Sequence, residues 1–394
     1  RKFWSAASVV PLAVPSLVGG FTFVAAFGAG GIIHQWIRSV MPSATIPNIY
    51  GFWGACILLI FHSYPYVLLQ VRSALKGLDP AQEEAAQSLG HSSVSIFWRV
   101  IMPALRPAIL SGSLLVALYT LSDFAAVSLL QFDSFTRAIF VQYQASLNRN
   151  YAAVLSLVLV ALTGGILFLE SMVRGKAVYY RSGTGAKRKP KLTRLGHWRW
   201  PALMACSLLV LTSVGLPVGV TLYWLIRGIT QGQEILWQWV PILNSVGISL
   251  AAAFVTVAAA APIAVLSVRY RTPLAAALER AAYLGYALPG VVIALAMVFF
   301  GARYAGPLYQ TSAMLLLAYA VLFLPQALGA LRGSLLQVSP NIENLARSLG
   351  YSQGKTWVKV VLPIVWPGVL SGASLVFLTA MKELPATLLL SPIG

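Results

Sequence analysis

The sequence predicts an all-α, polytopic helical membrane protein built from two pseudosymmetric halves arranged as parallel repeats. First, 58% of the 394 residues are hydrophobic and only 10% are charged, which is outside the usual range of soluble domains. Second, apolar segments long enough to cross about 30 Å of hydrocarbon recur along the chain. Third, a polar segment near one end returns near the other end in the same register.

The repeat covers residues 79 to 112 and residues 339 to 372, which match without a gap at a constant spacing of 260 residues. The pairing of Pro65 with Pro325 sets this spacing. Further identical pairs include Arg72 and Arg332, Pro80 and Pro340, Glu83 and Glu343, Ala86 and Ala346, Ser88 and Ser348, Leu89 and Leu349, Gly90 and Gly350, Pro103 and Pro363, Pro107 and Pro367, and Leu110 to Gly112 with Leu370 to Gly372. Chance does not hold a register over so many positions.

Each copy of the repeat predicts two helices joined by a sharp bend. In the first copy, Asp79 is an expected N-cap and Pro80 occupies the first helical position, where a missing N–H does no harm. Gly90 supplies a left-handed residue that ends this helix, Ser92 caps a second helix, and Pro103 is expected to stop it. The second copy has its counterparts in Ser339, Pro340, Gly350, Ser352 and Pro363.

These polar hairpins stand between apolar segments of membrane-spanning length, so they are expected to lie outside the bilayer. Their second helices nevertheless carry large apolar residues, namely Ile96, Phe97, Trp98, Trp357, Val358 and Val361. Such a surface favours a protein partner. The alternative is that both hairpins are ordinary amphipathic surface loops.

This pattern resembles the EAA loop of ABC-transporter permeases, the cytoplasmic coupling helix that docks on the ATP-hydrolysing subunit. The first copy matches with Glu84-Ala85-Ala86, Gly90 and Met102-Pro103, whereas the second has Asn344-Leu345-Ala346 in the EAA positions. The resemblance implies two copies of an ATP-binding subunit at the cytoplasmic face, with ATP and Mg²⁺ bound there and no cofactor in this chain. The implied ATPase-coupling residues are Glu83, Glu84, Ala85, Ala86, Gly90, Glu343, Asn344, Ala346 and Gly350.

No motif in the sequence predicts enzyme chemistry or a metal site in this chain. Cys56 and Cys206 fall inside apolar segments, and the four histidines have no metal-ligand spacing. A nucleotide-binding P-loop is absent from the sequence, so we expect ATP hydrolysis to belong to a partner. The net charge of +18 does not indicate nucleic acid, because the basic residues gather in alternate loops.

The apolar pattern predicts nine spans in two halves. The first half covers residues 1–172, a basic cytoplasmic linker covers 173–199, and the second half covers 200–394. The expected spans are 6–27, 52–71, 107–130, 151–172, 200–226, 240–268, 281–301, 312–331 and 366–390. Comparing the halves, we expect an intact protein of about twelve spans, with segments missing from both ends of this sequence. The run 6–27 could instead be a signal peptide, but residues 14–20 match 288–294 in the second half.

Charge predicts the topology of these spans in a bacterial inner membrane. If the N-terminus is cytoplasmic and the chain changes side at every span, most lysines and arginines fall in inner loops. Both hairpins then lie in the cytoplasm, and the linker lies against anionic lipid headgroups.

Four charged residues, Asp123, Glu170, Lys382 and Glu383, lie inside expected spans, where ionisable groups are costly. Glu170 sits close to the inner end of its span, where snorkelling explains it. Asp123 coincides with Glu383 at the spacing of the repeat, and Lys382 precedes Glu383. One hypothesis is that the two acids face each other and line the translocation pathway of a cation. The other is that Lys382 pairs with Asp123 between the halves, since Lys382 and Glu383 diverge by about 100° on one helix. Both hypotheses stay open.

Two fused halves, with the segment Lys382 to Leu390 in the last span, are similar to the ferric-iron permeases of this superfamily. The resemblance implies iron delivered by a periplasmic binding protein, which we expect on the outer loops 29–50, 131–150, 227–240 and 302–311. Thiamine permeases share the fused layout, and sulfate, molybdate, polyamine and phosphonate permeases share the fold. An ion-coupled secondary transporter with parallel repeats, or a structural membrane scaffold, are alternatives from other classes.

Overall fold

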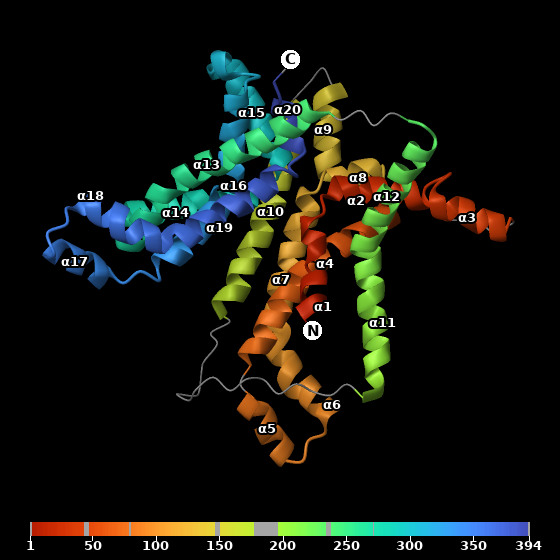
Figure 1. Ribbon diagram of the computed structural model, residues 1–394, viewed down its shortest axis with the longest axis horizontal. Coiled ribbons are helices and arrows are strands. Elements are labelled where there is room, and N and C mark those ends of the chain that lie inside the picture. The colour runs from red at the N-terminus through yellow and green to blue at the C-terminus, as the bar shows by residue number, and fades with distance from the viewer. Residues whose placement is uncertain are drawn as a thin grey trace. The chain divides into compact units, whose positions relative to one another are not determined.

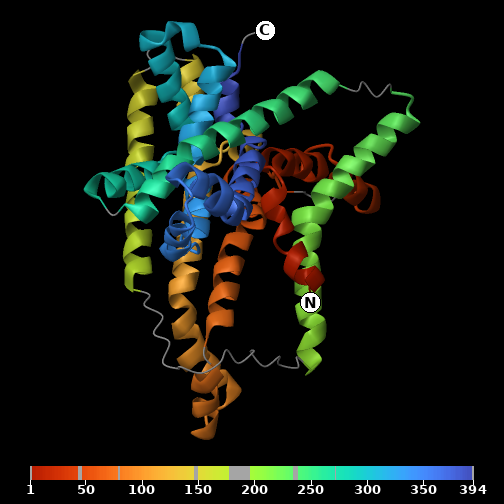
Figure 2. The ribbon, with the colours of Figure 1, turned by 60° about the vertical axis from the view of Figure 1, so that its left-hand side comes forward.

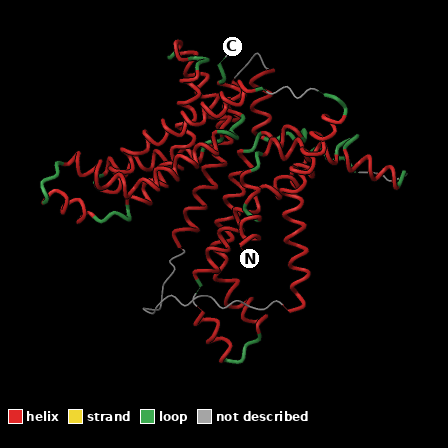
Figure 3. The backbone as a smooth tube through the Cα atoms, viewed as in Figure 1, coloured by secondary structure: helices red, strands yellow, loops and turns green. Residues whose placement is uncertain are grey.

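The structure is a computed structural model that describes residues 2–42, 47–78, 80–145, 150–176, 196–233, 238–270 and 272–392. Within these ranges every regular element is helical, which confirms the all-α prediction (Figure 3). The chain forms two compact units, Arg1–Glu234 and Ile235–Gly394. Each unit is described by itself.

The first unit is built on three long helices, α4 (Phe52–Gly77), α7 (Met102–Ser122) and α10 (Asn150–Lys176). In Figure 1, α7 lies beside α4 and also packs against α10. A core of Ala55, Leu58, Leu59, Ala126, Val127 and Leu130 joins α4 to the short helix α8 (Ala125–Leu129). The other helices are α1 (Lys2–Ala7), α2 (Ser16–Phe27), α3 (Ile32–Val40), α5 (Pro80–Ser88), α6 (Ser93–Ile96), α9 (Phe135–Ala145), α11 (Arg199–Val210) and α12 (Leu216–Thr230).

The second unit is built on α13 (Trp239–Arg269), α16 (Ser312–Leu335) and α19 (Leu362–Ala380), which all pack against one another. Small buried residues on α13, including Ala252, Ala260 and Ala264, allow close approach of the helix backbones. The other helices are α14 (Pro273–Tyr283), α15 (Gly290–Tyr304), α17 (Pro340–Ser348), α18 (Gln353–Thr356) and α20 (Pro385–Leu390).

The sequence repeat is reproduced in the helix boundaries. Helices α5 and α17, α6 and α18, and α7 and α19 begin at positions that differ by the spacing of the repeat, and so do α8 and α20. Ahead of each copy of the repeat, a 3-10 turn followed by a helix also recurs, as Val10–Ala13 with α2 and as Leu284–Ala287 with α15. Sequence and structure therefore divide the two halves into the same order of elements.

Eight helical stretches in the described residues are long and apolar enough to cross a membrane. They are Ser16–Val40, Phe52–Lys76, Ser93–Ser122, Asn150–Leu169, Gly196–Thr230, Trp239–Arg269, Ser312–Leu335 and Gln353–Ala380. The expected span 281–301 is not among them, because the turn Leu284–Ala287 and Pro289 interrupt the helix. The expected span 6–27 is interrupted in the same way at Val14 and Pro15.

Two other predicted helix ends are wrong. The spans expected at 107–130 and 366–390 end at Ser122 and Ala380, where the chain breaks before a short helix. Pro103 and Pro363, which were expected to stop helices, lie instead inside continuous ones, each just after a π-helical turn. A π-turn inserts an extra residue into the helical repeat, which makes room for the ring of the following proline.

The division into units differs from the predicted halves. Helices α11 and α12 were assigned to the second half, but they belong to the first unit, where α12 packs against α2. Apolar side chains cover α12, so it can be buried against any apolar neighbour. Most of the predicted linker, residues 177–195, lies outside the described residues.

Candidate functional site

Each repeat folds into an elbow, which we define as residues 80–101 for the first elbow and 340–361 for the second. In the first elbow, α5 ends at Ser88 and Gly90 adopts a φ of 81°. The N–H of Gly90 donates to the carbonyl of Gln87 (2.9 Å), and the N–H of His91 donates to that of Ala86 (3.2 Å). This pair of bonds is a Schellman cap, which fixes the direction of the bend.

The second elbow repeats this cap at the equivalent residues. Gly350 has a φ of 85°, and its N–H donates to the carbonyl of Arg347 over 3.0 Å. The N–H of Tyr351 donates to the carbonyl of Ala346 over 3.1 Å. The prediction that Gly90 and Gly350 are left-handed residues that end the first helix is therefore confirmed.

Serine side chains cap the helices on the far side of each bend. The hydroxyl of Ser92 accepts from the N–H of Ser95 (3.3 Å), and that of Ser352 accepts from the N–H of Lys355 (3.4 Å). Ser339 caps α17 as predicted, whereas Asp79 lies outside the described residues. With both ends of the bend hydrogen-bonded, the elbows are defined turns rather than slack loops.

The second arm of each elbow runs directly into a long apolar helix. In the first elbow, α6 continues through the π-turn Phe97–Ile101 into α7, and in the second, α18 continues through Trp357–Val361 into α19. The resulting helices Ser93–Ser122 and Gln353–Ala380 are two of the eight candidate spans. Each elbow is thus continuous with a helix long and apolar enough to cross a membrane.

Both elbows expose large apolar side chains at the same two positions. Leu89 is 78% exposed and its counterpart Leu349 is 71% exposed. On the second arm, Trp98 and its counterpart Val358 are also exposed. These residues form an apolar surface at each elbow, as expected for a site that docks on a protein partner.

Some of the predicted coupling residues are buried within their elbow, and others are exposed on its surface. Ala86 and Ala346 are buried on the inner side of their elbows, opposite the buried Ile96 and Thr356 of the second arms. The side chains of Glu83, Ala85 and Asn344 are exposed, and Glu84 is half-buried. The small alanines therefore let the two arms approach, while the neighbouring positions face outward.

A hollow lies beside each elbow. The first has a volume of about 420 Å³ and is lined by Gln82, Ala85, Ala86, Leu89, His91, Ser95, Ile96, Arg99 and Val100. The second has a volume of about 630 Å³ and is lined by Val268, Arg269, Tyr270, Glu343, Arg347, Gln353, Thr356 and Trp357. The first hollow is mostly apolar and the second is charged, so the two elbows offer different surfaces to a partner.

Glu343, a predicted coupling residue, is buried in an ion pair. Its carboxylate Oε1 lies 2.7 Å from Nη2 of Arg269, the last residue of α13. The same Arg269 nitrogen donates to the carbonyl of Val338 (3.1 Å), just before the second elbow. Glu343 therefore anchors the elbow to α13, and Arg269 is a site residue that the sequence analysis did not identify.

The repeated arginines connect the long helix that precedes each elbow, α4 or α16, to an earlier segment. Arg332 Nε lies 3.1 Å from Glu279 Oε1 of α14, and Arg72 Nη1 donates to the carbonyl of Ser5 in α1 over 3.3 Å. Ser5 and Glu279 are equivalent when residues 14–20 are aligned with 288–294. Arg72 binds a backbone oxygen, whereas Arg332 binds a carboxylate. Because the two partners differ in type, the sequence repeat revealed the arginines but not their partners.

Asp123 and Glu383 occupy the same structural position, at the break between a long helix and a short one. Asp123 Oδ1 accepts from the N–H of Ala126 over 2.9 Å, and Glu383 Oε1 accepts from the N–H of Ala386 over 3.5 Å. Each acid thus caps the short helix that follows it, α8 or α20. Buried charge next to a helix N-terminus is partly compensated by the helix dipole.

Each acid also touches the beginning of an earlier helix. Asp123 is hydrogen-bonded by the side chain of Ser16, the first residue of α2. At the equivalent place in the second unit, a Cβ built on Gly290, the first residue of α15, would lie 2.3 Å from Glu383 Oε1. The shorter acid therefore faces a serine, and the longer acid faces a glycine.

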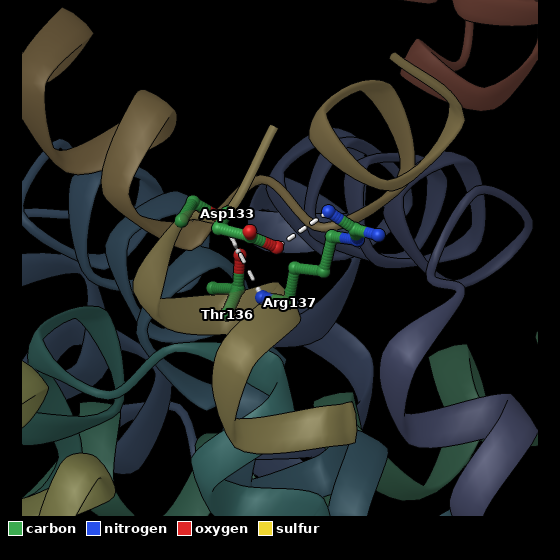
Figure 4. A network of polar contacts seen from close by, with 4 residues as sticks. Asp133, Thr136 and Arg137 are labelled. Atoms are coloured by element: carbon green, nitrogen blue, oxygen red, sulfur yellow. Dashed lines mark hydrogen bonds and ion pairs between the residues drawn. The ribbon is translucent and has the colours of Figure 1, made fainter. Parts of the chain in front are cut away.

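A polar network ties the start of α9 to the same break in the first unit. Thr136 Oγ1 donates to the carbonyl of Asp123 over 2.7 Å. Thr136 Oγ1 also lies 2.9 Å from Ser134 Oγ, in the group of polar contacts that Figure 4 draws. Asp133 and Arg137 form an ion pair of 2.5 Å at its outer edge. Because Lys382 belongs to the second unit and Asp123 to the first, their proposed pairing stays a prediction, as does the translocation pathway.

Comparison with known proteins adds an independent finding. The family model described as "Binding-protein-dependent transport system inner membrane component" matches residues 1–174 and 252–394 of this chain. The matched residues include both elbows and both acids. The match omits α11, α12 and most of the segment that precedes them.

Individual relatives carry transport names. The chain is 39% identical over 394 residues to the Fe(3+)-transport system permease protein FbpB 2 of Haemophilus influenzae, covering 99% of this chain and 74% of that protein. It is 24% identical over 408 residues to the ferric transport system permease protein FbpB of Actinobacillus pleuropneumoniae, covering 97% of this chain and 58% of that protein. The sulfate transport system permease protein CysT of Escherichia coli is 29% identical over 178 residues, or 44% of this chain and 62% of that protein.

Proposed function

The chain belongs to the family of binding-protein-dependent transport system inner membrane components, and from this membership we propose that it is the membrane-spanning subunit of an ATP-driven importer of ferric iron. It is a multi-pass inner membrane protein whose role is transport. In this proposal, two ATP-binding subunits at the cytoplasmic face hydrolyse ATP, and a periplasmic binding protein delivers the iron.

The observation that carries the proposal is the pair of elbows. Both have the same Schellman cap, the same exposed leucine and a second arm continuous with a spanning helix. An ion-coupled transporter does not require two matched elbows with apolar surfaces outside the bilayer. Two ATP-binding subunits that close on each other require one docking site each.

The proposed cycle follows from this geometry. ATP binding closes the paired ATPase subunits and draws the elbows together, and each elbow moves its spanning helix because the second arm is continuous with it. The helices then open toward the side of the binding protein, and hydrolysis returns them. The work is done by ATP and Mg²⁺ in the partner, while this chain transmits it.

Ferric iron as the substrate rests on the relatives. Three of the relatives that align with nearly the whole chain have ferric or Fe(3+) transport in their names, and a fourth is named only as a probable ABC transporter permease, whereas the sulfate permease aligns with less than half of the chain. Iron is the cargo in this proposal rather than a resident cofactor. Thiamine, sulfate or a polyamine are the alternative substrates.

The test is uptake by a strain from which the gene is deleted, complemented with the full-length protein. Radiolabelled ferric iron should accumulate only in complemented cells, and uptake of labelled thiamine and sulfate should not change. Restored thiamine or sulfate uptake without iron uptake would reassign the substrate. Purification of the protein from the same cells should also recover an ATP-hydrolysing partner, and iron uptake that persists after ATP is depleted would favour an ion-coupled transporter.

A further inference from the structure

Helix α3, Ile32–Val40, has two chemically different faces. At about 100° per residue, the five apolar residues fall on one side of the helix and the four polar residues on the other. The apolar face consists of Ile32, Ile33, Trp36, Ile37 and Val40, and the polar face consists of His34, Gln35, Arg38 and Ser39. With nine residues, α3 is too short to cross the bilayer.

The apolar face of α3 is only partly covered by the rest of its unit, since Ile32, Ile33 and Ile37 are half-buried. Trp36 is 66% exposed and Val40 is 62% exposed, and none of the residues of α3 is buried. In Figures 1 and 2, α3 projects outward from α2 and runs crosswise to the long helices α4 and α7. Among the helices, α2 is its main neighbour.

A hydrogen-bonded turn between α2 and α3 sets the direction of α3. Helix α2 ends at Phe27, and Gly30, with a φ of 85°, redirects the backbone before α3 begins. The side chain of Gln35 donates to the carbonyl of Gly30 over 2.8 Å and so fixes the turn. The second unit has no such helix in the corresponding connection between α15 and α16, which contains only the 3-10 turn Gly306–Leu308.

The segments on either side of α3 bear on what covers it. The candidate span Ser16–Val40 includes both α2 and α3, but its helix is broken at residues 28–31, so α2 leads to α3 from one side and α4, the next candidate span, follows it on the other. The first residues of α4, Phe52 and Trp53, which follow α3 in the sequence, are 54% and 75% exposed. Aromatic residues are enriched where a membrane protein meets the boundary between hydrocarbon and headgroups.

We propose that α3 is an interfacial helix, which lies in the plane of the bilayer with its apolar face in the hydrocarbon boundary and its polar face toward water. A short amphipathic helix with Trp and Ile on one face and Arg on the other has the composition expected for this position. The bilayer is continuous with the lipid-facing surface of α4, whereas a soluble partner would have to displace lipid to reach the apolar face. The inference rests on the membrane location of the chain and not on its substrate.

The test compares two adjacent residues on opposite faces. In full-length protein with Cys56 and Cys206 replaced by serine, single variants Val40→Cys and Ser39→Cys carry a nitroxide label. The protein is placed in phospholipid nanodiscs, and the accessibility of each label to oxygen and to a water-soluble nickel chelate is measured. The ratio of oxygen to nickel accessibility should be severalfold higher at residue 40 than at residue 39, because oxygen concentrates in hydrocarbon.

Both side chains are exposed, so neither substitution is expected to prevent folding. Equal ratios at the two residues would overturn the proposal, because α3 would then stand in water if both ratios are low, or cross the hydrocarbon with the candidate span Ser16–Val40 if both are high. Protection of residue 40 from both reagents, whether in the protein alone or only after the binding protein is added, would also overturn it, because a protein surface would then cover α3. None of these outcomes depends on iron transport, so the proposed function is tested separately.

Discussion

Glu343 Oε1 lies 2.7 Å from Arg269 Nη2, so the first arm of the second elbow is joined to the last residue of α13. Both side chains are largely buried. A buried charge is costly to leave without its partner, and this cost makes the pair an anchor for the elbow. The elbow and α13 should therefore move together during transport.

Replacing Arg269 should loosen this anchor. In Arg269→Ala, the buried carboxylate of Glu343 loses its counter-charge, with an expected loss of about 3 to 5 kcal/mol of stability. We expect a lower melting temperature of the purified protein in nanodiscs and a smaller stimulation of ATP hydrolysis by the loaded binding protein. The double variant with Arg269→Gln and Glu343→Gln should recover much of the stability, because it removes both charges.

The matched control is Arg347→Ala on α17, the helix that carries Glu343. Arg347 makes an exposed hydrogen bond of 2.9 Å to Asn344, and exposed polar pairs contribute about 0 to 1 kcal/mol. Its melting temperature should stay close to that of the unmodified protein. If the Arg269→Ala and Arg347→Ala proteins have the same melting temperature, Glu343 does not anchor the elbow.

The left-handed glycines should determine how well transport is coupled to ATP hydrolysis. Gly350→Val forces a β-branched residue to a φ of 85°, which costs about 1 to 2 kcal/mol and favours a different bend. We expect the protein to insert normally but iron uptake to fall, while ATP hydrolysis no longer responds to the binding protein. Gly90→Val should act in the same way through the first elbow.

Two variants control for effects other than the bend. Gly350→Asn should retain most of the uptake, because asparagine tolerates the left-handed conformation. Gly165→Ala, within α10, has open space at the added Cβ and should leave uptake unchanged. Normal binding-protein-stimulated ATP hydrolysis in both valine variants would mean that the elbows are not the coupling element.

The sequence predicted the elbows well because their signals are local. The positions of Gly90 and Ser92, with their counterparts, follow from backbone conformation and capping, which depend on a few neighbouring residues. The anchors could not be predicted, because Arg269 and Glu343 are brought together only when α13 packs beside the elbow. Identity at a fixed spacing marks a repeated residue, but not its partner.

The helix ends were harder to predict for a similar reason. Apolar composition continues past Ser122 and Ala380, so hydropathy alone extends both spans through the break. The signal that could have located the break is the acid itself, since Asp123 lies three residues before the N–H that it caps. An acid within an apolar run can mark a helix start as well as a pathway.

Uncharged substitutions of Asp123 should show whether this acid caps a helix or lines a cation pathway. If Asp123 acts as a cap, Asp123→Asn should preserve stability, because asparagine caps as well as aspartate, and Asp123→Ala should lose about 0.5 to 2 kcal/mol. If the acid lines a cation pathway, Asp123→Asn should abolish iron uptake while the protein stays folded. Melting temperature and iron uptake, measured on the same three proteins, distinguish the outcomes.

In the first unit the shorter acid Asp123 faces Ser16, and in the second unit the longer acid Glu383 faces Gly290. This match can be tested by introducing the residues of the first unit into the second. Gly290→Ser places a side chain against the carboxylate of Glu383, and overpacking of this kind costs about 1 to 3 kcal/mol. Adding Glu383→Asp shortens the acid and recreates the combination of Ser16 with Asp123 found in the first unit. The double variant should therefore melt at a higher temperature than Gly290→Ser alone, although Glu383→Asp by itself should be destabilising, since its carboxylate no longer reaches Gly290. If the two substitutions are simply additive, the acid and the start of α15 are not coupled, and the likeness between the units at this point has no energetic basis.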